Sequence, residues 1–129
     1  MDAAIQLIPV ERLVHIEGHS AKRVTWLANK IQAEGVWTKP LAVDAAHNLV
    51  LDGQHRMEAA IKLRLVHVPV VKYDYATVTL WSLRPTHQFD WQLVTERALA
   101  GKPYPYKTVK HRFPFPMPAC AIVLEELSR

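Results

Sequence analysis

The sequence is poor in the features that support disulfides, zinc clusters and membrane spans. Cys120 is the one cysteine among 129 residues, which excludes an intramolecular disulfide framework and a cysteine zinc cluster. No apolar run approaches the ~20 residues that cross a membrane, and the N-terminus lacks a signal-peptide pattern. These absences predict a soluble protein of the cytoplasm with no membrane partner.

The remaining composition is that of an ordinary globular domain with a modest positive charge. Half of the residues are hydrophobic and 22% are charged, with a net charge of +4 and a pI near 9.4. The chain is long enough to form one domain, residues 1–129, with its own core. The charge allows a nucleotide, a phosphorylated metabolite or a nucleic acid as partner. The charges are mixed in sign along the chain, however, unlike the basic face of strong nucleic-acid binders.

Apolar periodicity and capping residues predict an α+β fold, with a small mixed sheet flanked by helices. The clearest helix begins after Ser20, a good N-cap, and ends before Gly35. Its apolar stripe is expected to carry no functional residue. Short runs of β-forming residues predict strands, and the proline in the first of them suits an edge strand or a first strand. The expected strands cover residues 5–14, 40–43, 49–51, 67–73 and 78–83, the other helices cover 53–63 and 91–100, and 121–127 forms a last strand or helix.

The apolar run 49–51 ends in Asp52 and Gly53, directly before a helix-like segment. Asp52 is a good N-cap, and Gly53 lets the backbone turn sharply and lets a ligand approach it. The unpaired amides and the dipole of a helix N-terminus favour an anion, and His55 and Arg56 add polar, basic groups there. These residues alone fit a phosphate cradle and an ordinary capped helix equally well.

Two polar groups precede the first helix. Glu17 is either a surface residue that suits the helix dipole or a general base, and the second role requires that Asp52 reach the same substrate. His15 and His19 are four residues apart, but Gly18 argues against a helix between them. We therefore expect no structural zinc site there.

The segment 102–118 carries five of the nine prolines and is predicted to be a surface loop. Its basic residues, including Lys107 and Lys110, form either a solvated loop or a flap that closes over phosphate oxygens. Tyr104 and Tyr106 either stack on a base or stiffen the loop against the core.

Five short motifs follow one another along the chain: Glu17, residues 35–40 (GVWTKP), residues 52–56 (DGQHR), Trp81 and residues 107–115 (KTVKHRFPF). In this order they resemble the ParB/sulfiredoxin superfamily, and within it the free L-serine kinases most of all. Those kinases carry D-G-H-H-R where this chain has Gln54 for the first His, and an Arg where it has Lys110. The resemblance spans nearly the whole chain and implies the small α+β fold of that superfamily.

The resemblance implies a phosphotransferase that uses ATP or ADP with Mg²⁺ to phosphorylate free L-serine or a similar hydroxylated metabolite. It makes Glu17 the acid that takes the hydroxyl proton. It makes Asp52 a residue that helps to hold serine or Mg²⁺. The main ligands of Mg²⁺ would be the phosphates of the nucleotide. Phosphoryl transfer needs positioning and charge neutralisation, which a helix N-terminus, a basic flap and Mg²⁺ would supply. The implied phosphate contacts are Gly53, Gln54, His55, Arg56, Lys107 and Lys110, and the implied substrate contacts are Asp52, Trp81, Thr108 and His111.

Two other members of the superfamily are the alternatives. Sulfiredoxin chemistry needs a nucleophilic cysteine in a G-C-H-R motif, where this chain has Gln54. A ParB-like module that binds a nucleotide or DNA, or cuts DNA, without kinase activity shares the helix start at Gly53 and would bind DNA with a steep salt dependence. A partition protein would add a helix-turn-helix domain, for which the residues after Pro85 leave no room.

Overall fold

The computed structural model describes residues 4–83 and 89–129. Its main sheet has five strands in the order β1-β6-β4-β5-β2. β1 (Ile5–Pro9) is antiparallel to β6 (His67–Tyr73), which runs parallel to β4 (Leu41–Asp44). β5 (Leu49–Asp52) is antiparallel to β4 and parallel to β2 (Val14–His15). The predicted small mixed sheet is therefore confirmed.

The predicted first strand over residues 5–14 is divided in the structure. The short 3₁₀ helix η1 (Val10–Arg12) separates β1 from β2, and Pro9 precedes it with a φ of −60°. Because proline fixes φ and has no N–H, it favours the end of a strand over its continuation. β1 lies at the sheet edge, one of the two places that its proline suits, while β2 forms the opposite edge and leads directly to Glu17.

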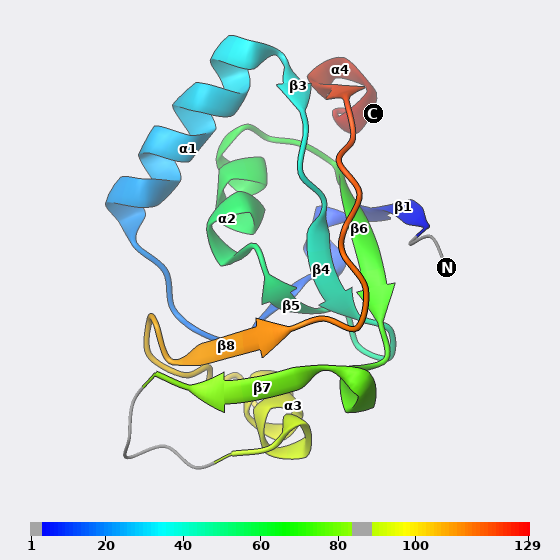
Figure 1. Cartoon of the computed structure of the whole chain (residues 1–129). Coiled ribbons are helices and arrows are strands. Elements are labelled where there is room, and N and C mark those ends of the chain that lie inside the picture. The colour runs from blue at the N-terminus through cyan, green and yellow to red at the C-terminus, as the bar shows by residue number, and fades with distance from the viewer. Residues whose placement is uncertain (1–3, 84–88) are drawn as a thin grey trace.

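Two helices cover one face of this sheet (Figure 1). α1 (Ala21–Glu34) begins at the Ser20 cap, whose Oγ accepts from the Arg23 amide, and ends at Gly35 with a φ of 74°, as predicted. α2 (Gln54–Lys62) follows β5 and packs against α1. The strands alternate, so that Val43 and Val50 join the core beneath these helices. Ala42 and Leu49 join a second core on the other face.

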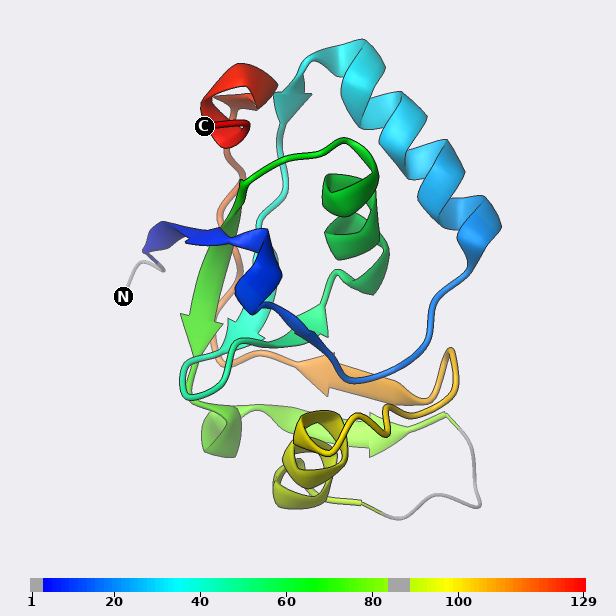
Figure 2. The ribbon, with the colours of Figure 1, turned by 180° about the vertical axis from the view of Figure 1, so that it is seen from behind.

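The second face is covered by a two-stranded ribbon and a helix (Figures 1 and 2). β7 (Thr79–Ser82) follows η2 (Tyr75–Thr77), and α3 (Trp91–Leu99) begins at the predicted cap Asp90. β8 (Val109–Arg112) is antiparallel to β7, with Trp81 opposite Lys110. The prediction that 102–118 is entirely loop is therefore wrong at its centre. Residues 109–112 alternate between less and more exposed positions, a strand pattern hidden by the flanking prolines.

The C-terminal segment returns to the helix side of the molecule. β9 (Ile122–Val123) pairs with β3 (Val36–Trp37), the segment between α1 and β4. α4 (Leu124–Leu127) follows at once, so residues 121–127 contain both a strand and a helix. In the two ranges that the structure describes, no helix is long and apolar enough to cross a membrane.

Candidate nucleotide and substrate cleft

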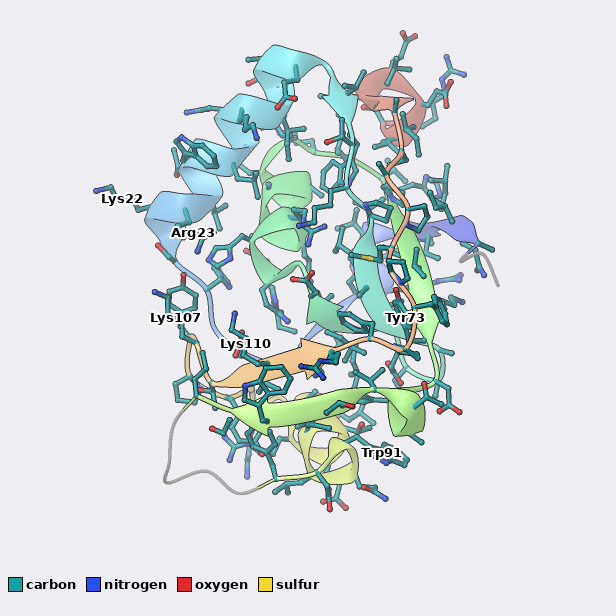
Figure 3. The ribbon with its side chains drawn as sticks, in the orientation of Figure 1. Lys22, Arg23, Tyr73, Trp91, Lys107 and Lys110 are labelled. Atoms are coloured by element: carbon teal, nitrogen blue, oxygen red, sulfur yellow. The ribbon has the colours of Figure 1, made fainter. Side chains whose placement is uncertain are left out.

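A cleft of about 780 Å³ opens between α1, the start of α2 and β8. Figure 3 shows Arg23 on the α1 side of this space, and Lys107 and Lys110 on the β8 side. Ligand sites for small molecules commonly measure ~300–1,000 Å³, so the cleft has room for a nucleotide. Of the eleven site residues that the resemblance implies, nine line the cleft, namely Glu17, Asp52, Gly53, Gln54, His55, Arg56, Lys107, Lys110 and His111.

The turn from β5 into α2 forms the floor of the cleft around Gly53. Gly53 is the N-cap, with a φ of 117°, and no side chain caps the helix. A Cβ at Gly53 would lie 2.9 Å from Cγ of Leu41, so that only glycine fits without a shift. The prediction that Asp52 caps α2 is wrong, because its carboxylate instead lies 3.4 Å from Nη2 of Arg56. The helix N-terminus therefore keeps the amides and the dipole that favour an anion.

Arg56 is held largely by the protein itself. Its Nη1 donates to the carbonyl of Lys39 at 3.2 Å and also to that of Pro40, which ties α2 to the segment before β4. Burial lowers the pKa of Arg56, and the neighbouring Asp52 opposes that shift. Arg56 thus borders the cleft as a buried cation that also braces its wall.

The side chains of Gln54 and His55 are both hydrogen-bonded to other parts of the protein, and neither adds a positive charge to the cleft. The Gln54 side chain is buried, donates to the carbonyl of Val50 and contacts Nδ1 of His15. Nε2 of His55 accepts from the Ser20 amide at 3.0 Å, which assigns the proton of the neutral ring to Nδ1. Burial lowers the pKa of His55, with further contributions from Arg23 and two histidines. At neutral pH His55 is therefore an uncharged hydrogen-bonding group.

Glu17, in the loop that precedes α1, is hydrogen-bonded to the backbone at the start of β8. Its Oε2 accepts from the amides of Thr108 at 3.0 Å and Val109 at 2.9 Å. Thr108 is fully buried, and its hydroxyl donates to the carbonyl of Pro105 at 2.6 Å. The Glu17 carboxylate is consequently fixed at the cleft, while Thr108 is not among the residues that line it.

His111 lies deeper in the cleft wall and is neutral. Its Nε2 is 2.8 Å from the hydroxyl of Tyr75. Burial lowers the pKa of His111 to about 4, although the charge of Asp52 acts in the opposite direction. Trp81 is 44% exposed and does not line the cleft, although it sits opposite Lys110 in the β7–β8 pair.

The cleft also contains residues that the sequence patterns did not identify. Arg23 and Lys30 lie seven residues apart on the face of α1 that borders the cleft, together with Leu27 and Ile31 of the apolar stripe. Two residues of this stripe thus border the cleft, although the sequence led us to expect no functional residue there. The i, i+7 spacing of the two cations was the available signal. Tyr106, for which the sequence left base stacking open, lines the opposite side, and its hydroxyl accepts from Arg23 at 3.3 Å.

The charges around the cleft suit an anion and one divalent ion. Six lysine and arginine side chains line it against three carboxylates, those of Glu17, Glu34 and Asp52. Among the described residues, no group of three histidine, cysteine, aspartate or glutamate side chains could hold a metal. Mg²⁺ commonly takes only one or two carboxylates and completes its shell with phosphates and water. Asp52, about half exposed at the helix start, fits that donor set.

No protein-family model matches the sequence, and no curated protein is similar to it. A free serine kinase in complex with AMP has a TM-score of 0.88 at 14% identity, over 98% of this chain and 95% of that one. A variant of a free serine kinase in complex with ADP matches equally well. A conserved hypothetical protein from Pyrococcus furiosus has a TM-score of 0.86 at 12% identity, over 98% of both chains. C-terminally truncated SbnI from Staphylococcus aureus has a TM-score of 0.85 at 12% identity, over 97% and 89%.

At these identities the likeness concerns the fold. The chain has the fold of the free serine kinase, nearly from end to end. This confirms the α+β fold that the ordered motifs predict.

Proposed function

We propose that this chain is a small-molecule kinase of the cytoplasm that transfers a phosphoryl group from ATP or ADP to free L-serine or a similar hydroxylated metabolite. One observation carries the proposal. Glu17 and Asp52 share a cation-rich cleft with the uncapped start of α2, in a fold that is also that of a kinase solved with AMP and with ADP. An acid, an anion site and room for a second ligand are what phosphoryl transfer to a hydroxyl requires.

In this proposal the phosphates lie at the amides of residues 54–56, with Lys107 and Lys110 on the opposite side. Mg²⁺, held by the phosphates and Asp52, would neutralise the charge that develops on the transferred group. Glu17 takes the proton of the substrate hydroxyl, whose oxygen forms a bond to the terminal phosphorus. The bond from that phosphorus to the bridging oxygen breaks, and the departing nucleotide keeps the electron pair. His111 and His55 contribute as neutral hydrogen-bonding groups.

Replacing the proposed base tests this assignment. Glu17→Gln keeps an amide oxygen that can accept from Thr108 and Val109, but it removes the basic carboxylate. Turnover should fall by ~10²–10⁴-fold while the affinity for ADP changes little. The assay mixes protein, Mg²⁺, L-serine and ATP or ADP, and measures O-phosphoserine by mass spectrometry. Equal turnover in the variant and the wild type would refute the role of Glu17.

A second candidate is a nucleotide-binding module that does not transfer phosphate. It is favoured by the two backbone amides that already engage Oε2 of Glu17, which is how a structural carboxylate is used. A thermal-shift panel of ATP, ADP, CTP and serine separates the two candidates when combined with the phosphoserine assay, because ligands that bind the native state raise the melting temperature. Stabilisation by a nucleotide without product formation supports the module.

A further inference from the structure

Two polar residues, His15 and Glu58, lie next to Gln54 at the start of α2 but do not line the cleft themselves. His15 belongs to β2 and pairs in register with Val50 of β5. Glu58 lies on α2, one helical turn after Gln54, so that the two side chains share a face of the helix. Both His15 and Glu58 are partly buried.

Hydrogen bonds join these residues into a closed loop. Nδ1 of His15 contacts Oε1 of Gln54, and Nε2 lies 2.8 Å from Oε2 of Glu58. Gln54 uses its amide nitrogen on the carbonyl of Val50, so its oxygen is the acceptor and His15 is the donor. Both ring nitrogens of His15 therefore face acceptor oxygens at positions i and i+4 of α2. His19 also lies beside Glu58, with its Nε2 3.7 Å from Oε1, and its ring stacks on that of His15 at 5.0 Å.

The contacts of His15 connect two segments that border the cleft. His15 is two residues before Glu17, and its ring contacts Gln54, the first residue after Gly53. His15 thus lies at the start of the segment that carries the proposed base, Glu17. Its ring also contacts the first residue of the helix that would bind the phosphates. A shift of about 1 Å between reacting groups can cost ~10²-fold in rate.

We propose that His15, Gln54 and Glu58 are positioning residues that set the spacing between Glu17 and the first turn of α2. The interpretation of Gln54 changes accordingly: its side chain acts through His15 and not on a phosphate. The functional part of this proposal rests on the proposed kinase activity. The structural part, a mechanical link between two segments, does not.

Amide exchange tests the link independently of any activity. The Gly18 amide donates to the Tyr104 carbonyl and the Met57 amide to the Gly53 carbonyl, both at 2.8 Å, so the two amides report on the two segments. In His15→Ala both should exchange at least ~10-fold faster, while the Val94 amide in α3 keeps its rate and thereby excludes global unfolding. Faster exchange at only one of the two amides, or at neither, would overturn the link.

Kinetics test its role in the reaction. Glu58→Ala removes an acceptor from His15, whereas Glu58→Gln retains an amide oxygen there, and His67→Gln is a control outside the cleft lining. Glu58→Ala should lower kcat ~10- to 100-fold with less than a threefold change in ADP affinity, and Glu58→Gln should recover most of that loss. A loss confined to ADP affinity would overturn the positioning role. If the wild type makes no phosphoserine, but both amides exchange faster in His15→Ala, the kinase activity is refuted and the link between the two segments stands.

Discussion

A methyl group added at Gly53 should damage both the fold and the anion site. At a φ of 117° the backbone is strained for any residue with a side chain, and the new Cβ would lie 2.9 Å from Cγ of Leu41 and 3.4 Å from Cζ of Arg56. The backbone strain costs ~1–3 kcal/mol, and the crowding adds ~1 kcal/mol or more. Gly101→Ala is the matched control, because Gly101 has a φ of 72° and open space around its Cβ position.

The two alanine variants should therefore differ by the crowding, by the larger backbone strain at a φ of 117° than at 72°, and by the effect on ligand. For a chain of this size ~1 kcal/mol corresponds to a shift of ~3–6 °C in Tm, so Gly53→Ala should melt at least that far below Gly101→Ala. Calorimetry measures this difference, and ADP titrations should show at least ~10-fold weaker binding in Gly53→Ala alone. Equal Tm values, or wild-type ADP affinity in Gly53→Ala, would refute the close packing at the cleft floor.

Three further predictions concern charge and metal. Because the pKa of His111 falls from 6.5 to about 4 on folding, the unfolded chain binds the extra proton between those values. The free energy of unfolding should thus drop by up to about 3 kcal/mol as the pH falls through that window. Urea titrations should show a smaller drop in His111→Gln, and an identical drop contradicts the assignment. Lys110→Ala should weaken ADP binding ~5- to 30-fold and flatten its salt dependence, unlike Lys102→Ala. EDTA should abolish phosphoserine formation and added Mg²⁺ should restore it, whereas EDTA-resistant turnover contradicts a metal-assisted transfer.

The elements that could be predicted from the sequence are those governed by local chemistry. Ser20 and Gly35 bound α1 because a hydroxyl cap and a left-handed glycine satisfy the helix ends whatever surrounds them. Asn48 closes the β4–β5 hairpin with a φ of 57° for the same kind of local reason. The α+β class followed from such signals.

One error arose from two competing local signals, because Asp52 has the sequence signature of a cap but its carboxylate pairs with Arg56 four residues later. The other features that the sequence did not reveal depend on distant segments. The resemblance made Gln54 a phosphate contact, and nothing in the sequence indicated that its side chain contacts His15, 39 residues away. The strand β8 could not be predicted because its partner β7 lies on the other side of α3 in the sequence. No local pattern reports such partners.

An amide-resolved NMR titration of the full chain with ADP and Mg²⁺ tests where the phosphates bind. If the phosphates lie between the start of α2 and β8, the largest shift changes should fall on residues 53–56 and on Lys107 and Lys110, and should be reduced in Lys110→Ala. Largest changes at the opposite sheet edge, β1 and β6, or no change at the start of α2, would rule out this nucleotide site.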